Sequence, residues 1–306
     1  NATQGWVPTI DEAVTDVPAA PSANQEGIFG FGGDPTVGVT NLVSNAGVVA
    51  SDVSAVGTAR VTPAACEYGN DKGIFGFGNT GATRHGMTNL VSSSGVVASD
   101  VSAVGTARNV LAAATYGGDK GIFGFGNTGS YTAVTNLVSN AGVVATDTTG
   151  VGTARGYLGA CEYSSNKDKA IFGFGAGSIL SMTNLVSNVG VVSTDVTGVG
   201  TARYEIAACS YGGDKGIFGF GDTGSNTAVT NLVSNAGVVA TDTTGVGTAR
   251  KGLAACEYGN DKGIFAYGYV SDYASMSNLV SNTGVVASDV TGVGTDRTAL
   301  AACSFN

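Results

Sequence analysis

Short apolar segments of strand length alternate with turn residues along most of the chain. A representative stretch contains residues 121–126 (GIFGFG), 135–139 (TNLVS), 142–147 (GVVATD) and 157–161 (YLGAC). These segments are rich in β-branched and aromatic residues, and Gly, Ser, Asn and Asp separate them. No segment has the 3.6-residue spacing of apolar positions that marks an amphipathic helix. The pattern therefore predicts an all-β protein.

This set of four segments recurs six times, and each copy is called a unit below. The apolar hexamers begin 46 to 49 residues apart, at positions 27, 73, 121, 170, 216 and 263. Four short antiparallel strands at this period predict a blade, and six copies predict a closed six-bladed β-propeller of four-stranded antiparallel blades. A solenoid is the alternative. Closure is favoured because solenoids usually carry polar caps, and the last unit ends after residues 301–303 (AAC) without one.

A second pattern gives the order of the strands within a unit. Where the first unit meets the second, Arg60 precedes the small residues 64–66 (AAC), a Tyr68-Gly69 turn follows, and the apolar strand 74–78 ends in glycine. Over residues 27–306 this arrangement resembles the kelch repeat. The resemblance implies a propeller in which the small-residue strand is innermost. The units are also similar, more weakly, to repeat arrays of environmental phage tail proteins and extracellular surface proteins.

The kelch strand order implies that the C-terminal strand closes the ring. Residues 300–303 (LAAC) would then pair with the hexamer at Gly27. Residues 17–20 (VPAA) compete for that place, but Pro18 and Pro21 each remove a ladder donor. We therefore expect an extended N-terminal arm over residues 1–26 and the propeller over 27–306.

Composition narrows the environment and the partners. The chain has 14 basic and 23 acidic residues and a net charge of -9, without a basic cluster, which argues against nucleic acid. Its apolar runs are far shorter than the roughly 20 residues that cross a bilayer, so no membrane span is expected. A start at Asn1 without Met predicts an exported protein whose leader was removed, at an extracellular or virion surface. Asn1 also begins an N-glycosylation sequon.

One aspartate and one arginine recur in every unit, eight residues apart. The pairs are Asp52 and Arg60, Asp100 and Arg108, Asp147 and Arg155, Asp195 and Arg203, Asp242 and Arg250, and Asp289 and Arg297. The aspartate can fold the intervening loop through an Asx-turn, and the arginine can bond carbonyls or a carboxylate between blades. A structural role is therefore predicted. A ring of calcium sites is the alternative, although one carboxylate per loop supplies few oxygens.

Five of the six units carry a cysteine at one position. The cysteines are Cys66, Cys161, Cys209, Cys256 and Cys303, and Ala114 takes the place in the remaining unit. Equivalent positions around a ring are unlikely to meet disulfide geometry, and no His or carboxylate completes a CxxC-type metal spacing. We expect free, buried, small side chains, with a thiolate ring around a metal as the alternative.

Nothing in the sequence predicts a catalytic, cofactor or metal site. Residues 76–81 (GFGNTG) match the dinucleotide pattern GxGxxG, but a strand follows where that chemistry needs a helix. His85 is the only histidine and has no repeated partner for nucleophilic catalysis. Because an active site breaks symmetry and the units are nearly alike, a non-enzymatic protein is expected.

Near-sixfold sameness favours assembly. The leading hypothesis is a structural propeller that polymerises with itself into a fibre, surface layer, virion or tail structure. The contacts would come from its outer strands and from the arm residues Trp6, Val7, Pro8 and Ile10. The alternative is an adhesin or lectin that binds surface glycans or proteins with the variable loops of one face, where Tyr131, Tyr269 and Tyr273 are the available aromatic platforms.

Overall fold

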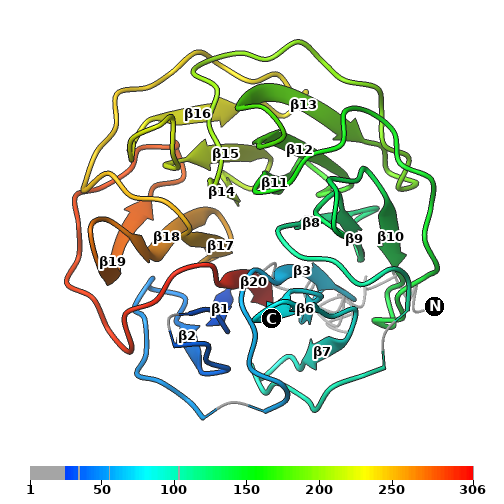
Figure 1. Ribbon diagram of the computed structural model, residues 1–306. Helices are drawn as coiled ribbons and strands as arrows, with labels where there is room; N and C mark the ends of the chain where they lie inside the picture. Colours follow the sequence, from blue (N-terminus) through cyan, green and yellow to red (C-terminus); the bar gives the residue numbers. More distant parts are fainter. Residues whose placement is uncertain (1–24, 34, 55, 103, 306) are drawn as a thin grey trace, which may run out of the picture.

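The computed structural model describes residues 25–33, 35–54, 56–102 and 104–305. Within these ranges every regular element is a strand and none is a helix, so the all-β prediction is confirmed. The strands form six three-stranded antiparallel sheets and one two-stranded hairpin. Figure 1 shows the six sheets side by side in a ring, with the chain passing round it from β1 to β20.

Each sheet has an inner, a middle and a third strand. The inner strands are β20 (Ala301–Phe305), β3 (Ala64–Tyr68), β8 (Ala112–Tyr116), β11 (Gly159–Tyr163), β14 (Ala207–Tyr211) and β17 (Ala254–Tyr258). The middle strands are β1 (Glu26–Gly30), β4 (Lys72–Gly76), β9 (Lys120–Gly124), β12 (Lys169–Gly175), β15 (Lys215–Gly219) and β18 (Lys262–Tyr269). The third strands are β2 (Thr40–Val43), β7 (Thr88–Val91), β10 (Thr135–Val138), β13 (Leu180–Val186), β16 (Thr230–Val233) and β19 (Tyr273–Val280). The hairpin consists of β5 (Asn79–Thr80) and β6 (Thr83–Arg84).

The first and last described strands share one sheet. β20 pairs with β1 in antiparallel register, with Ile28 opposite Cys303 and Gly27 opposite Ser304. The inner strands contact one another in the cyclic order β20, β3, β8, β11, β14, β17 and back to β20. The C-terminal strand therefore pairs with the first hexamer, as the sequence predicts, and joins the two ends of the ring.

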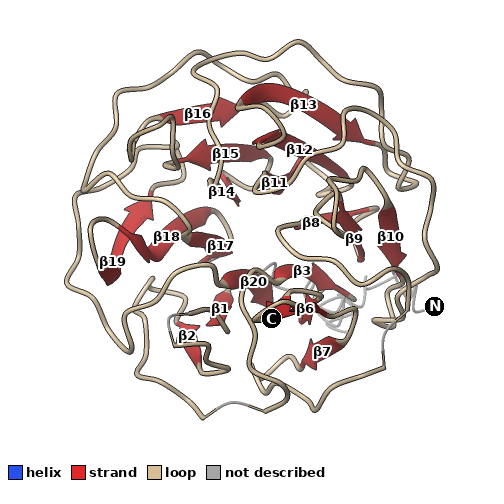
Figure 2. Ribbon diagram, in the orientation of Figure 1, coloured by secondary structure: helices blue, strands red, loops and turns tan. Residues whose placement is uncertain are grey.

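The fourth segment of each unit differs from the prediction of a fourth strand. It follows the third strand on the outside of the ring, where Figure 2 draws it as loop. In the first unit it meets β2 only through two isolated bridges, Val43 to Val49 and Thr40 to Val53. The two bridges are out of register by one residue, which interrupts the ladder as a β-bulge does. The Asn41 side chain lies in this gap, where its Nδ2 donates to the Ala50 carbonyl at 2.9 Å.

Aromatic side chains pack each sheet onto the next. Phe123 of β9 meets Phe77, which follows β4, edge to face with ring centroids 5.1 Å apart. A Cβ atom on Gly76 would lie 2.7 Å from the Phe123 Cζ, so glycine gives the ring its place. The equivalent ring pairs are Phe29 with Tyr267, Phe31 with Phe75, Phe125 with Phe172, Phe174 with Phe218, and Phe220 with Phe265. Interdigitated rings thus form the core between neighbouring sheets.

Candidate functional site

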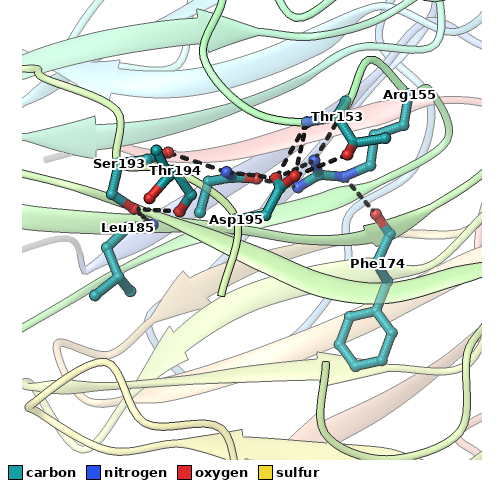
Figure 3. A network of polar contacts seen from close by, with 8 residues as sticks. Thr153, Arg155, Phe174, Leu185, Ser193, Thr194 and Asp195 are labelled. Carbon is teal, nitrogen blue, oxygen red and sulfur yellow. Dashed lines mark hydrogen bonds and ion pairs between the residues drawn. The ribbon is translucent and has the colours of Figure 1, made fainter. Parts of the chain in front are cut away.

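Each of the six repeated arginines is buried between two sheets. Arg155 is fully buried and uses its whole guanidinium group. Its Nε donates to the Phe174 carbonyl at 2.8 Å, Nη1 to the Thr153 carbonyl at 3.1 Å and Nη2 to Asn184 Oδ1 at 2.6 Å (Figure 3). Its guanidinium carbon lies 4.2 Å from the centre of the Phe125 ring, which belongs to the preceding sheet. One side chain therefore links two sheets and the loop between them.

These arginines also accompany a strained backbone position. The aromatic residue whose carbonyl accepts from Arg155, Phe174, has a φ of 63°. Such a left-handed conformation is uncommon for an aromatic residue and requires support from its surroundings. The pairing register of β12 with β13 shifts at the same place, between Gly173 and Gly175. The charged hydrogen bond from Nε thus holds a bulge that turns the chain out of the middle strand.

The carboxylate partner of each arginine is not the aspartate eight residues before it but the equivalent aspartate of the following unit. Asp195 accepts from the Thr153 backbone N–H at 3.0 Å and from Thr153 Oγ1 at 2.7 Å, and Arg155 Nη1 lies 3.9 Å from its Oδ1 (Figure 3). The corresponding pairs are Arg60 with Asp100, Arg108 with Asp147, Arg203 with Asp242, Arg250 with Asp289, and Arg297 with Asp52. The aspartate therefore anchors the loop that enters its own sheet, in place of the local Asx-turn that the spacing indicates.

Burial and hydrogen bonding set the charges of this network. Burial lowers the pKa of Arg155 to about 10, although Asp195 opposes that shift. Burial by itself would raise the pKa of Asp195, but hydrogen bonds from Asn184 and Thr153 outweigh it, so the pKa is lowered. Both groups are charged at neutral pH. Because hydroxyl and amide donors face the carboxylate, its surroundings suit an arginine better than a calcium ion. Within the described residues, no group of three or more His, Cys, Asp or Glu side chains is placed to hold a metal ion.

The five cysteines are free and buried, and their thiols face glycines of the next sheet. A Cβ atom on Gly121 would lie 2.5 Å from Cys66 Sγ, and one on Gly73 would lie 2.5 Å from Cys303 Sγ. In the second unit Ala114 replaces the cysteine, and the residue at the facing glycine position is Ala170, in the same buried cluster. The smaller side chain at the cysteine position is thus matched by a larger one at the glycine position. Burial also raises the pKa of the Cys66 thiol, which makes it a poor nucleophile.

At one end of the ring, called the carboxylate face, acidic and hydroxyl residues alternate around the axis. The residues that follow the cysteine positions are Glu67, Thr115, Glu162, Ser210, Glu257 and Ser304, and all are buried. Lys167 from the loop after β11 lies 2.6 Å from Glu257 Oε2 and 3.4 Å from Glu162 Oε1. Burial opposes the charge on this lysine, but the carboxylates prevail and raise its pKa. The ammonium group thus lies across the carboxylate end of the axis.

At the opposite end, called the funnel face, the ring surrounds a pocket of about 290 Å³. Its wall has one apolar residue from each unit: Pro63, Leu111, Leu158, Ile206, Leu253 and Leu300. Its rim has one residue from each unit, and all six differ: Thr62, Val110, Tyr157, Glu205, Gly252 and Ala299. Backbone hydrogen bonds connect neighbouring rim residues, as from Glu205 N–H to the Tyr157 carbonyl at 2.9 Å. This pocket, named the funnel, is sixfold in its wall and asymmetric at its rim.

Polar side chains gather on one side of the funnel. Lys251 Nζ lies 2.7 Å from Asp222 Oδ2 and 4.0 Å from Glu205 Oε2, and Tyr204 packs edge to face with Tyr157 at 6.2 Å. Burial raises the pKa of Glu205, and Lys251 only partly offsets that effect. An apolar cup with one carboxylate in its rim is suited to binding an apolar group that carries a hydrogen-bond donor.

The remaining predicted residues are distributed as follows. Tyr269 at the end of β18 and Tyr273 at the start of β19 pack against each other, with ring centroids 5.6 Å apart. Tyr131 packs closely on Gly156, where an added Cβ atom would lie 2.8 Å from the tyrosine ring. His85 Nε2 lies 3.1 Å from Thr80 Oγ1 in an exposed loop. The predicted assembly residues Trp6, Val7, Pro8 and Ile10 and the sequon at Asn1 lie outside the described residues.

Sequence reasoning missed Lys167, Tyr157 and Glu205. The signals were present: a longer loop, residues 164–168, precedes the hexamer at Ala170, and the first two residues after each arginine differ in all six units. Their convergence on the axis depends on how the sheets are arranged in space.

Comparisons with known proteins give no family for this chain. No family model matches it, and no curated protein matches it. Among the described residues, there is no helix with the length and apolar character needed to span a membrane.

Proposed function

We propose that the six sheets are the blades of a kelch-like six-bladed β-propeller. The cyclic contacts of the inner strands and the pairing of β20 with β1 support this interpretation. The unit length and the position of the small-residue strand next to the axis agree with the same fold.

We further propose that this propeller is a non-catalytic building block that associates with copies of itself in an extracellular or virion structure. The observation that carries the proposal is a ring of exposed apolar side chains in the outer segments. The residues, named the valine belt, are Val48, Val96, Val143, Val191, Val238 and Val285, each 63–65% exposed. Each is followed by a buried valine, so the segment is fixed while one side chain of every unit faces solvent.

Charge substitution in the valine belt tests this proposal. The variant Val48→Lys/Val143→Lys/Val238→Lys should remain folded and lose the side-by-side association of rings, measured by sedimentation velocity and electron microscopy across concentrations. A matched control, Ser51→Lys/Thr146→Lys/Thr241→Lys, adds the same charge at exposed positions of the same segments and retains the valines. Equal association of the belt variant and the wild type would refute the proposal.

A second candidate function is recognition of surface glycans or proteins by the variable loops of the funnel face. Its specific support is the tyrosine-rich side of this face, where Tyr157 packs on Tyr204 and Tyr269 on Tyr273. Aromatic faces next to carboxylates are a common setting for sugar hydroxyls and rings. A glycan array probed with the full chain and with Tyr273→Ala decides it: signal that the variant loses supports recognition, and absence of signal rejects it.

A further inference from the structure

The funnel is a pocket on the axis of the ring that the repeated contacts leave unexplained. The arginine network and the aromatic pairs recur around the ring and serve packing, whereas the funnel has a rim that differs in every unit. Its volume, about 290 Å³, lies just below the roughly 300–1,000 Å³ of typical small-molecule sites. The size fits one inserted side chain better than a long oligosaccharide.

The chemistry of the funnel defines that side chain. The wall consists of proline, leucine and isoleucine, which favour an apolar body. The Glu205 carboxylate lies in the rim at 4.0 Å from Lys251, beyond hydrogen-bond distance, and can accept a further donor. An indole has a large apolar surface and a single N–H donor with no acceptor, and so meets both conditions.

The chain itself supplies one indole. Trp6 is the only tryptophan of the protein and the only aromatic residue among residues 1–24. The apolar residues Val7, Pro8 and Ile10 follow it in the sequence. From Trp6 to Gln25 there are 19 residues, enough to span about 60 Å when extended. Reach therefore does not limit where Trp6 binds.

The positions of the arm and the funnel at opposite faces of the ring favour binding of Trp6 to the funnel of another copy. Glu26 pairs with Phe305 at the carboxylate face, whereas Ala301, next to the funnel residue Leu300, lies at the other end of β20. The arm thus departs from the face opposite the funnel. The direct route along the axis is obstructed where Lys167 binds Glu162 and Glu257. A copy stacked on the carboxylate face presents its funnel directly to the arm.

We propose that the funnel of one copy binds the Trp6 side chain of the next, with the indole N–H donating to Glu205, so that copies join head to tail. This contact is heterologous and, unless it closes into a larger ring, produces an open filament. The inference rests on the proposed self-assembly and names its axial contact, whereas the valine belt serves lateral contacts.

Tryptophan fluorescence of the full chain tests the contact, because Trp6 is the only reporter. Its emission should shift to the blue as the concentration rises, together with assembly in sedimentation velocity. Trp6→Ala should abolish filaments. Trp6→Phe, which keeps the apolar ring and removes the donor, should raise the concentration for half-assembly by about tenfold. A blue emission that is independent of dilution would show that the arm binds its own ring and would overturn the proposal.

Complementation identifies the receptor. Ala299→Trp fills the funnel at a half-buried rim residue whose φ of 54° an L-residue already occupies. Ser178→Trp is the matched control, because it places an indole at an exposed site in a variable loop between β12 and β13. The Trp6→Ala and Ala299→Trp variants are both made in the Val48→Lys/Val143→Lys/Val238→Lys background, which removes the lateral contacts; each should then be monomeric alone, and the two should form 1:1 dimers when mixed, without further growth.

The outcomes separate this inference from the proposed function. Failure of the mixed variants to dimerise, or normal filaments from Trp6→Ala, would reject the funnel contact. If the valine-belt variant loses association in the same experiments, self-assembly stands without the funnel. If the wild type shows no association at any concentration, the proposed function fails as well.

Discussion

The exchange of cysteine and glycine for two alanines makes a quantitative prediction about packing near the axis. Five units place a thiol against a glycine, and one places Ala114 near Ala170. Gly121→Ala would bring a methyl group to 2.5 Å from Cys66 Sγ, whereas carbon atoms in contact prefer about 3.5–4.0 Å. Neither atom lies at the end of a flexible chain, so the neighbouring strands must move.

The expected cost follows from overpacking. Gly121 does not have a positive φ, so alanine suits its backbone and would otherwise stabilise by about 0.4–1 kcal/mol. The clash should reverse this sign and lower the free energy of unfolding by about 1–3 kcal/mol. Cys66→Ala alone removes a buried sulfur and should cost about 1 kcal/mol. The double variant recreates the Ala114 and Ala170 pair and should lie close to the wild type.

Urea unfolding of the four proteins completes the cycle, with the slope checked for changes in cooperativity. The coupling energy between Gly121→Ala and Cys66→Ala should be about 1–3 kcal/mol and favourable. The reverse cycle is an internal control: Ala114→Cys should destabilise, and adding Ala170→Gly should restore stability. Additive effects in both cycles would show that the two positions do not compete for one volume, and the packing argument would be wrong.

Three further outcomes follow from the charged networks. Arg155→Lys should lower the free energy of unfolding by about 2–4 kcal/mol, because one ammonium cannot replace the bonds to Phe174 and Asn184; an unchanged urea midpoint would contradict this. Lys167 has a raised folded pKa, so its contribution is complete below the unfolded value near 10.5 and is lost as pH rises through the folded value. Melting temperatures of the wild type and Lys167→Met should therefore differ at pH 7 and converge at strongly alkaline pH. Asp195 has a lowered pKa, so its contribution is present above about pH 3.8 and is lost at lower pH. Asp195→Asn should weaken the acid dependence of melting, and identical pH profiles would reject this.

The features of the fold that the sequence predicts are those that the repeated pattern reinforces. The period of the units, the strand character of their segments and the pairing of residues 300–303 with the hexamer at Gly27 all follow from patterns that six copies reinforce. The inert cysteines follow from the same symmetry, because equivalent positions point alike around a ring. In each case a local rule, applied six times, has only one consistent arrangement.

The arginine partners show where this reasoning stops. The sequence allows a carboxylate bond between blades but does not say which aspartate each arginine meets; in the structure Asp195 lies next to Arg155, and Asp147 lies next to Arg108. The loop that carries the arginine crosses to the next sheet, so its nearest carboxylate in space belongs to the sheet that it enters. The prediction of a fourth strand is wrong for a similar reason. A one-residue change of register interrupts the hydrogen-bond ladder of the outer segment, and such a change is not visible in the pattern of apolar residues.

Apart from the variable loops, the departures from sixfold symmetry lie near the axis, and this location has a physical explanation. Between sheets, every arginine contacts an aromatic ring and also an aspartate of the following unit, so a change in one unit would break a buried charged network. Near the axis a residue faces equivalent residues of its neighbours, and a single substitution can be matched by one partner, as Ala114 is by Ala170. Side chains near the axis at the carboxylate face and the funnel face contact solvent on one side, so these positions tolerate still larger substitutions. Tyr157, Glu205 and Lys167 lie in these positions, where they are half-buried and charged or aromatic. The residues near the axis therefore make the carboxylate face and the funnel face chemically different from each other, although the units are nearly alike.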